Sequence, residues 1–120
     1  MAGKIITDVG LNELAKLIAG SGNAMTHIAV GTGTNGPSVD DTGLEAEVLR
    51  KAATATVSGN EATFEMTINA GEIIDKNITE IGLFNADSGG TLYYREVRKA
   101  LYFDESVGAI IKIRCTFERG

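Results

Sequence analysis

The sequence contains one histidine, His27, and one cysteine, Cys115. A Cys–His pair catalyses only when the two side chains lie within hydrogen-bond reach. Cys115 alternates with Ile113 and Phe117 on one face of a predicted strand, where we expect a buried and unreactive thiol. One Cys and one His also cannot supply the three or four protein ligands of a usual zinc site. The pair therefore predicts neither catalysis nor a metal centre.

Residues 31–36 read Gly-Thr-Gly-Thr-Asn-Gly and match, letter for letter, the glycine fingerprint of dinucleotide-binding proteins. That fingerprint holds a pyrophosphate at the N-terminus of a helix that begins in the glycine turn. Here a polar stretch with a proline, residues 37–43, follows instead. The position about 20 residues further on, where a ribose-binding acid is expected, holds Lys51 followed by two alanines. The sequence predicts a glycine-rich loop between strands and no cofactor.

Four carboxylates follow this loop: Asp40, Asp41, Glu45 and Glu47. Carboxylate oxygens suit hard divalent cations, but this spacing matches no calcium-binding loop. A solvated acidic turn is the favoured interpretation, and no metal ion is expected.

Three further glutamates alternate with apolar residues on predicted strands, as solvent-facing side chains do: Glu61, Glu65 and Glu80. No pair among the sixteen carboxylates has a spacing that suggests acid–base chemistry. The sequence therefore predicts a protein that is not an enzyme.

Five of the basic residues in the C-terminal third could form a cluster: Arg95, Arg98, Lys99, Lys112 and Arg114. They would gather on one side if the last two strands are neighbours, and could then receive the acidic residues 40–47 of another subunit. The alternative is ordinary cross-strand ion pairing with Glu96 and Glu118.

Composition limits the possible classes of protein. At 120 residues with 43% hydrophobic residues, the chain predicts a single domain over residues 1–120 that can bury a core without disulfides. A net charge of -5 argues against a nucleic-acid partner. The start shows no signal-peptide pattern, and no apolar run approaches the roughly 18 residues of a membrane span. We expect synthesis in a cytoplasm and no membrane partner.

The predicted elements are organised around a β-hairpin over residues 77–97, apolar on both faces and therefore expected at the centre of a sheet. A helix is predicted over about residues 7–19, with Thr7 or Asp8 as its cap. Its apolar stripe is expected to face the core: Leu11, Leu14, Ala15, Leu17 and Ile18. Further strands are predicted over residues 25–30, 49–57, 61–69 and 109–118, with a partly extended segment over residues 98–103. The fold class is mainly β (α+β by strict count), an N-terminal amphipathic helix followed by an antiparallel β-sandwich of about six or seven strands over residues 25–119.

Four stretches resemble, in order and spacing, small virion domains of tailed bacteriophages. Residues 6–17 resemble the opening I-T-x-x-G-L-x-x-L-A, and residues 26–33 are similar to the strand and loop I-A-V-G-T-G-T. Residues 42–50 resemble D-T-x-L-x-x-E-V-x-R, and residues 78–84 resemble I-T-E-I-G-L-F. The family is the tail-fibre or tail-collar-fibre N-terminal type, and the resemblance runs from about residue 5 to the C-terminus.

The resemblance implies a non-enzymatic structural protein of the virion, a tail, collar, baseplate or fibre-attachment subunit. Such a subunit oligomerises, as a homotrimer or hexamer, and docks onto other virion proteins after synthesis in the host cytoplasm. Because fibres of this kind continue into a shaft and tip, a chain of 120 residues is expected to be a standalone subunit. One alternative is a capsid decoration protein on the head surface. A second is a carbohydrate- or receptor-binding sandwich, which the absence of tryptophan disfavours.

Aromatic residues concentrate at protein interfaces, so four of them are candidate interface anchors: Tyr93, Tyr94, Tyr102 and Phe103. The alternative is that they fill the core of the subunit itself. The charged interface candidates are Arg95, Arg98, Lys99, Asp40, Asp41 and Glu45.

Overall fold

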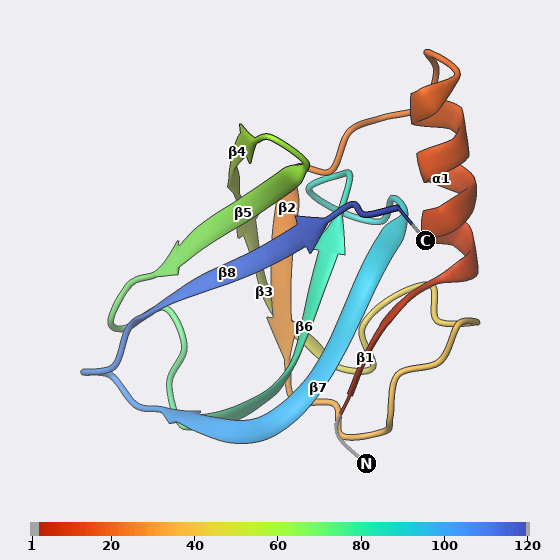
Figure 1. Ribbon diagram of the computed structural model, residues 1–120. Coiled ribbons are helices and arrows are strands. Elements are labelled where there is room, and N and C mark those ends of the chain that lie inside the picture. Colours follow the sequence, from red (N-terminus) through yellow and green to blue (C-terminus); the bar gives the residue numbers. More distant parts are fainter. Residues whose placement is uncertain (1–2, 120) are drawn as a thin grey trace.

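The structure is a computed structural model that describes residues 3–119 (Figure 1). These residues form one helix and eight strands: β1 (Gly3–Ile6), α1 (Asp8–Ile18), β2 (His27–Gly31), β3 (Glu47–Ala52), β4 (Thr54–Ser58), β5 (Glu61–Ile68), β6 (Lys76–Phe84), β7 (Leu92–Phe103) and β8 (Ala109–Thr116). The strands make two antiparallel sheets. The larger has the order β1-β7-β6-β2-β3 and the smaller the order β4-β5-β8. The described helix is too short and too polar to cross a membrane.

The predicted central hairpin is confirmed as β6 and β7. Strand β6 is the middle strand of the larger sheet, and Leu83 of β6 lies opposite Tyr94 of β7. Gly89 and Gly90 of the connecting loop both have positive φ angles, which a glycine adopts without strain. The hairpin is buried on both faces, as its apolar composition predicts.

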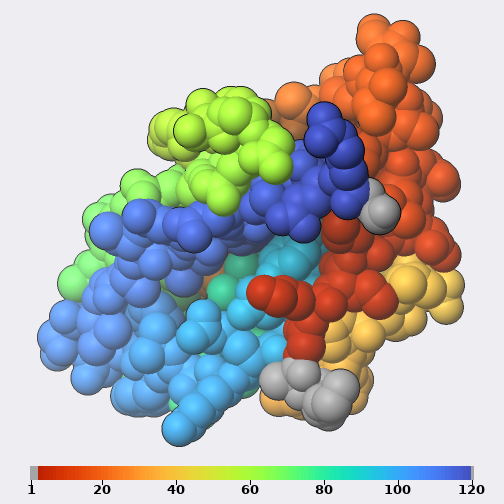
Figure 2. Space-filling model, in the orientation of Figure 1, coloured from red at the N-terminus to blue at the C-terminus, as the bar shows by residue number. Residues whose placement is uncertain are grey.

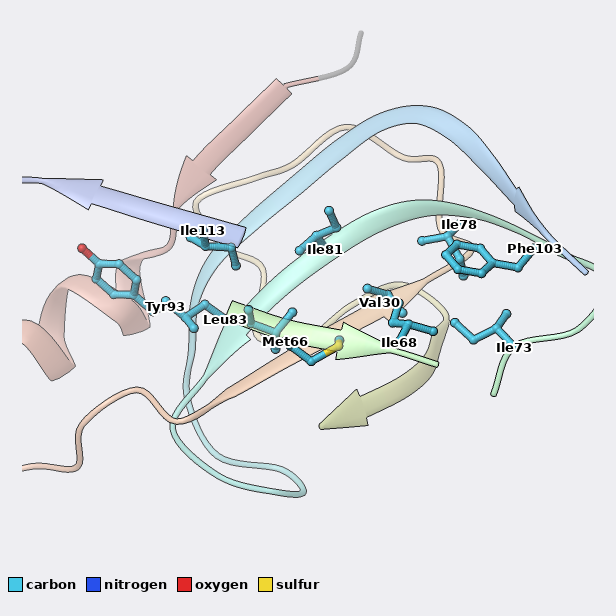
Figure 3. Packing of buried hydrophobic residues seen from close by; sticks show 11 residues of the cluster. Val30, Met66, Ile68, Ile73, Ile78, Ile81, Leu83, Tyr93, Phe103 and Ile113 are labelled. Carbon is cyan, nitrogen blue, oxygen red and sulfur yellow. The ribbon is translucent and has the colours of Figure 1, made fainter. Parts of the chain in front are cut away.

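The hydrophobic core draws side chains from both sheets (Figure 3). The larger sheet contributes Val30, Ile78, Ile81 and Leu83, among others, and the smaller sheet contributes Met66, Ile68 and Ile113. The alternation predicted for residues 61–69 is confirmed, since Met66 and Ile68 are buried while Thr67 is exposed. A β-bulge between Ile78 and Glu80 breaks the regular alternation of β6, so Ile78 joins the core while the Thr79 hydroxyl donates to the carbonyl of Gly33. Thr79 consequently does not join Ile81 and Leu83 in the core.

Two predicted segments differ from the structure, and one strand was not predicted. Residues 49–57 are two strands, because the chain leaves one sheet at Ala53 and enters the other. Residues 98–103 continue β7 as one long strand. The short strand β1, which pairs with β7 at the edge of the larger sheet, was not predicted because four residues carry too little pattern.

The helix lies where the sequence predicts it, but a different face packs inward. Thr7 is the N-cap, and its side chain accepts the N–H of Gly10 at 3.0 Å. The buried helical residues are Gly10 and Glu13, whereas Leu11 is 50% and Ile18 is 83% exposed. The expectation that the apolar stripe faces the core was therefore wrong for its outer members.

Gly10 explains how the helix docks. A Cβ at this position would lie 2.7 Å from both the Cα and the carbonyl oxygen of Tyr93, so the helix packs directly on the backbone of β7. The side chain of Thr7 adds a hydrogen bond to the carbonyl of Leu92 on the same strand. Backbone contact thus positions α1, with Leu14 packed against the core cluster and Leu11 left in solvent.

We predict that Gly10→Ala lowers the free energy of unfolding by about 1–3 kcal/mol, since the new methyl group meets backbone atoms that cannot move aside cheaply. Urea denaturation measures the change. Gly43→Ala is the matched control, because a Cβ there has no atom within 4 Å, and we expect a change below about 0.5 kcal/mol. Equal stability of the two variants would contradict this account of helix docking.

Candidate interaction surface

A buried ion pair lies at the centre of the larger sheet, between Glu80 of β6 and Arg95 of β7. Glu80 is fully buried and Arg95 is 2% exposed. Nε of Arg95 lies 3.1 Å from Oε1 of Glu80, and Nη1 of Arg95 donates to Oδ2 of Asp41 at 3.1 Å. The expectation that Glu80 faces solvent was wrong, because the loop after β2 folds over this face of the sheet.

Glu80 also holds that loop in place. Its carboxylate accepts the backbone N–H groups of Gly33 at 2.9 Å, Glu45 at 2.9 Å and Ala46 at 2.7 Å. A buried carboxylate is stable only when it is paired and hydrogen-bonded in this way. The glycine-rich loop and the acidic turn are consequently parts of the fold, and no helix begins in the glycine turn.

The acidic residues of the turn are mostly occupied by contacts within the chain. Glu45 accepts the N–H of Thr34 at 2.8 Å and of Asn35 at 3.1 Å, and Glu47 pairs with Arg50 at 2.7 Å. Asp40 is exposed. Among residues 3–119 no three His, Cys, Asp or Glu side chains are grouped closely enough to hold a metal ion.

The basic residues do not gather. Strands β7 and β8 belong to different sheets, so the premise that the last two strands are neighbours was wrong. Lys112 and Arg114 of β8 instead face β5, where each lies 3.5 Å from a carboxylate oxygen, of Glu65 and Glu61 respectively. The expectation that these two residues pair with Glu96 and Glu118 was therefore also wrong.

Arg98 and Lys99 are exposed on the second half of β7. They remain available on the surface, unlike Arg95, whose role as an interface residue is contradicted by its burial under the loop.

The four aromatic candidates separate into two groups. Tyr93 and Phe103 are buried in the hydrophobic core, which is the alternative that the sequence left open. Tyr94 is half-buried and its hydroxyl donates to Glu96 at 2.6 Å. Tyr102 is exposed, and its hydroxyl donates to Asp75 at 2.7 Å. Tyr102 is thus the aromatic candidate that offers the most surface.

The His27 and Cys115 side chains lie on different sheets, on β2 and β8. Nδ1 of His27 lies 2.8 Å from the hydroxyl of its neighbour Thr26. Burial raises the pKa of the Cys115 thiol, which keeps it protonated and weakly nucleophilic near neutral pH.

An apolar groove runs between α1 and the inner face of the smaller sheet, with a volume of about 240 Å³. The helix supplies Leu14 and Leu17 to one wall, and Phe64, Cys115 and other apolar side chains supply the opposite wall and the floor. In Figure 1 the helix stands to one side of β4, β5 and β8. Every side chain that lines the groove is apolar apart from the tyrosine hydroxyl of Tyr93 and the thiol of Cys115.

The groove is bordered by apolar side chains that solvent reaches. Val57 on β4 is 77% exposed, Phe117 after β8 is half exposed, and Leu11 and Ile18 project from the helix. Val57 and Phe117 line the groove themselves, whereas Leu11 and Ile18 belong to the same helical stripe as the groove residues Leu14 and Leu17. An exposed apolar surface makes this side of the molecule the candidate interaction surface. Sequence reasoning missed the groove, although the apolar stripe of the helix carried the signal for one of its walls.

No protein-family model matches the sequence, and no match was found among curated proteins. The interpretation of the surface accordingly depends on the residues of the chain and on their geometry.

We predict that Glu80→Gln lowers the free energy of unfolding by about 3 kcal/mol or more, since Arg95 then lies buried without its nearest counter-charge. Chemical denaturation measures the loss. Glu65→Gln is the control, because its ion pair with Lys112 is solvent-exposed, and we expect a loss below about 1 kcal/mol. Similar losses in the two variants would contradict the central role of Glu80.

The tyrosines predict a loss of stability at alkaline pH. Burial, followed by the hydrogen bond to Glu96, raises the pKa of Tyr94, and burial also raises the pKa of Tyr93. The hydrogen bond to Asp75 raises the pKa of Tyr102. In the unfolded chain tyrosines ionise near their ordinary pKa of about 10, so above this pH the unfolded state releases protons that the folded state keeps. Stability is therefore fully present below about pH 10 and falls as the pH rises further.

Urea denaturation at a series of pH values up to about 11 tests this dependence, and phenolate absorbance reports ionisation directly. We expect Tyr94→Phe to show a shallower loss of stability above about pH 10 than the unsubstituted protein. Phenolate formation at the same pH in the folded and urea-unfolded protein would contradict the prediction.

Proposed function

We propose that this chain is a non-enzymatic structural subunit of a tailed-phage particle. In this proposal it is a tail, collar, baseplate or fibre-attachment component that oligomerises and docks onto other virion proteins. The observation that carries the proposal is the exposed apolar border of the groove beside α1.

The positions of the four stretches that resemble phage virion domains support the proposal. Thr7 and Gly10 of the first stretch fix the helix on β7. Gly33 of the second, Glu45 of the third and Glu80 of the fourth meet in one hydrogen-bonded cluster. The resembling stretches therefore supply residues that contact one another in the larger sheet. This is what we expect if proteins with the same stretches share this fold.

The arrangement of the sheets fits the same proposal. Both sheets send side chains into the same core cluster, and we interpret them as a β-sandwich whose larger sheet is covered on its second face by residues 32–46. A sandwich of this kind gives a rigid subunit whose outer edges and loops are free for assembly.

The surface supports association through apolar contact. A helix buried only for the stability of its own domain would turn its leucines and isoleucine inward, whereas α1 leaves Leu11 and Ile18 in solvent. Removing such side chains from water stabilises a contact by about 25 cal/mol per Å² before the entropy of association is subtracted. In the assembled particle these residues would be covered by another copy or by a neighbouring virion protein.

We expect the purified protein to form a defined homotrimer or hexamer at micromolar concentration, measured by light scattering behind a sizing column. Ile18→Lys should shift the mass towards smaller species, because it places a charge in the apolar border. Val39→Lys is the matched control, since Val39 is also partly exposed but lies in the loop before the acidic turn, and its mass should not change. A monomer at every concentration would contradict self-association as the working principle.

A further inference from the structure

Strand β4 is an edge strand without the features that normally protect an edge. It pairs with β5 on one side, and no strand described in residues 3–119 pairs with its other side. All five of its residues are exposed. From Ala52 to Asn60 the sequence contains no charged residue and no proline. Natural sheets usually protect such an edge with lysine, proline, a bulge or a covering segment, because its free backbone groups recruit another strand.

The other sheet edges do carry protection. Strand β8 has Lys112 and Arg114, and β3 has Glu47, Arg50 and Lys51. Strand β1 is four residues long and includes Lys4. In Figure 2 the yellow-green atoms around the turn between β4 and β5 form a raised lobe at the surface of the molecule. The lack of protection is thus particular to β4.

We propose that β4 pairs antiparallel with β4 of a second copy of this chain, about a two-fold axis that passes through Thr56. The pairing would join two smaller sheets into one continuous six-stranded sheet across the interface. This inference deepens the proposed self-association and rests on it only in requiring that copies of the chain meet.

The sequence of β4 is self-complementary in this register. Residues directly opposite each other in an antiparallel pair share a face, so Thr56 meets Thr56 of the second copy and Thr54 meets Ser58. On the other face Ala55 meets Val57. The outer face then carries a ladder of hydroxyl groups, and the inner face carries small apolar contacts.

The distribution of charge favours pairing of two copies through β4 over pairing of two copies through β8. A two-fold pairing of β8 about Ile113 would place Lys112 opposite Arg114, and like charges directly opposite each other destabilise a sheet. The β4 pairing places no charged residue opposite another within the strand.

The pairing also continues the apolar groove. Ala55 and Val57 line the groove beside α1, and Val57 is largely exposed in the single chain. Opposite Ala55, the Val57 of the second copy would extend the groove wall across the axis. A two-fold contact of this type occurs in a hexamer built from two trimers and is absent from a simple cyclic trimer.

Disulfide trapping tests the register directly. In a Cys115→Ala background, Thr56→Cys would place two thiols opposite each other across the axis, at the spacing of roughly 4.5–5.5 Å between Cα atoms that a disulfide accepts. We expect a covalent dimer on mild oxidation. Thr54→Cys in the same background is the matched control, because residue 54 lies opposite residue 58 and more than about 7 Å from its own copy. Thr54→Cys should stay uncrosslinked.

A charge exchange gives an independent readout without cysteine. Thr56→Lys and Thr56→Glu each place like charges across the axis, so each variant alone should dissociate at a several-fold higher concentration than the unsubstituted protein. An equimolar mixture should recover the association, because lysine then faces glutamate. Thr63→Lys, on the neighbouring strand β5, controls for an added charge on the same face.

The results separate this inference from the proposed function. The β4 pairing is wrong if Thr56→Cys crosslinks no faster than Thr54→Cys. It is also wrong if the mixture of charge variants associates no more tightly than each variant alone, even though the unsubstituted protein still oligomerises. If the unsubstituted protein is a monomer at every concentration, self-association itself is wrong. Circular dichroism of each variant establishes that loss of association is not loss of folding.

Discussion

The buried carboxylate of Glu80 is the constraint on which the larger sheet depends. Its charge is removed from water, so the fold has to supply a counter-charge and hydrogen-bond donors at the same point. Arg95 provides the counter-charge from the neighbouring strand, and three backbone N–H groups come from residues 33–46. If the loop left this face, three hydrogen bonds to the charged carboxylate would break, which is why a long segment with little secondary structure is held in one conformation.

This constraint explains the glycines of the loop. A Cβ on Gly31 would lie 2.5 Å, and one on Gly33 2.6 Å, from Oε2 of Glu80. Any larger residue would push the loop away from the carboxylate and break the hydrogen bonds that satisfy it. The first two glycines of the pattern that imitates a nucleotide-binding fingerprint are therefore required for packing against Glu80. The anion that the Gly33 amide binds is this carboxylate of the protein itself.

The sequence predicted those parts of the fold that have a regular period or a distinct turn. The central hairpin, the alternation of β5 and the helix with its Thr7 cap all follow from local patterns. The burial of Glu80 could not be predicted in the same way. A strand residue that points away from the core shows the same sequence alternation whether water or a loop covers it. The change of sheet at Ala53 was missed for a related reason, since a strand that crosses between two sheets keeps its residue types and changes only its partner.

The apolar groove beside α1 was missed because an amphipathic pattern shows which side chains avoid water but not what covers them. The stripe of α1 led to the expectation of a buried face, yet the helix is attached through Thr7 and Gly10 to the backbone of β7. Attachment through a cap and a glycine, with Leu14 packed against the core, leaves Leu11 and Ile18 without a role in fixing the helix. Leu11 and Ile18 are exposed, so their apolar side chains add little to the stability of the domain through burial in its own core. The proposed contact with another chain would account for their apolar character, and the same proposal covers Val57 on the unprotected edge of the smaller sheet.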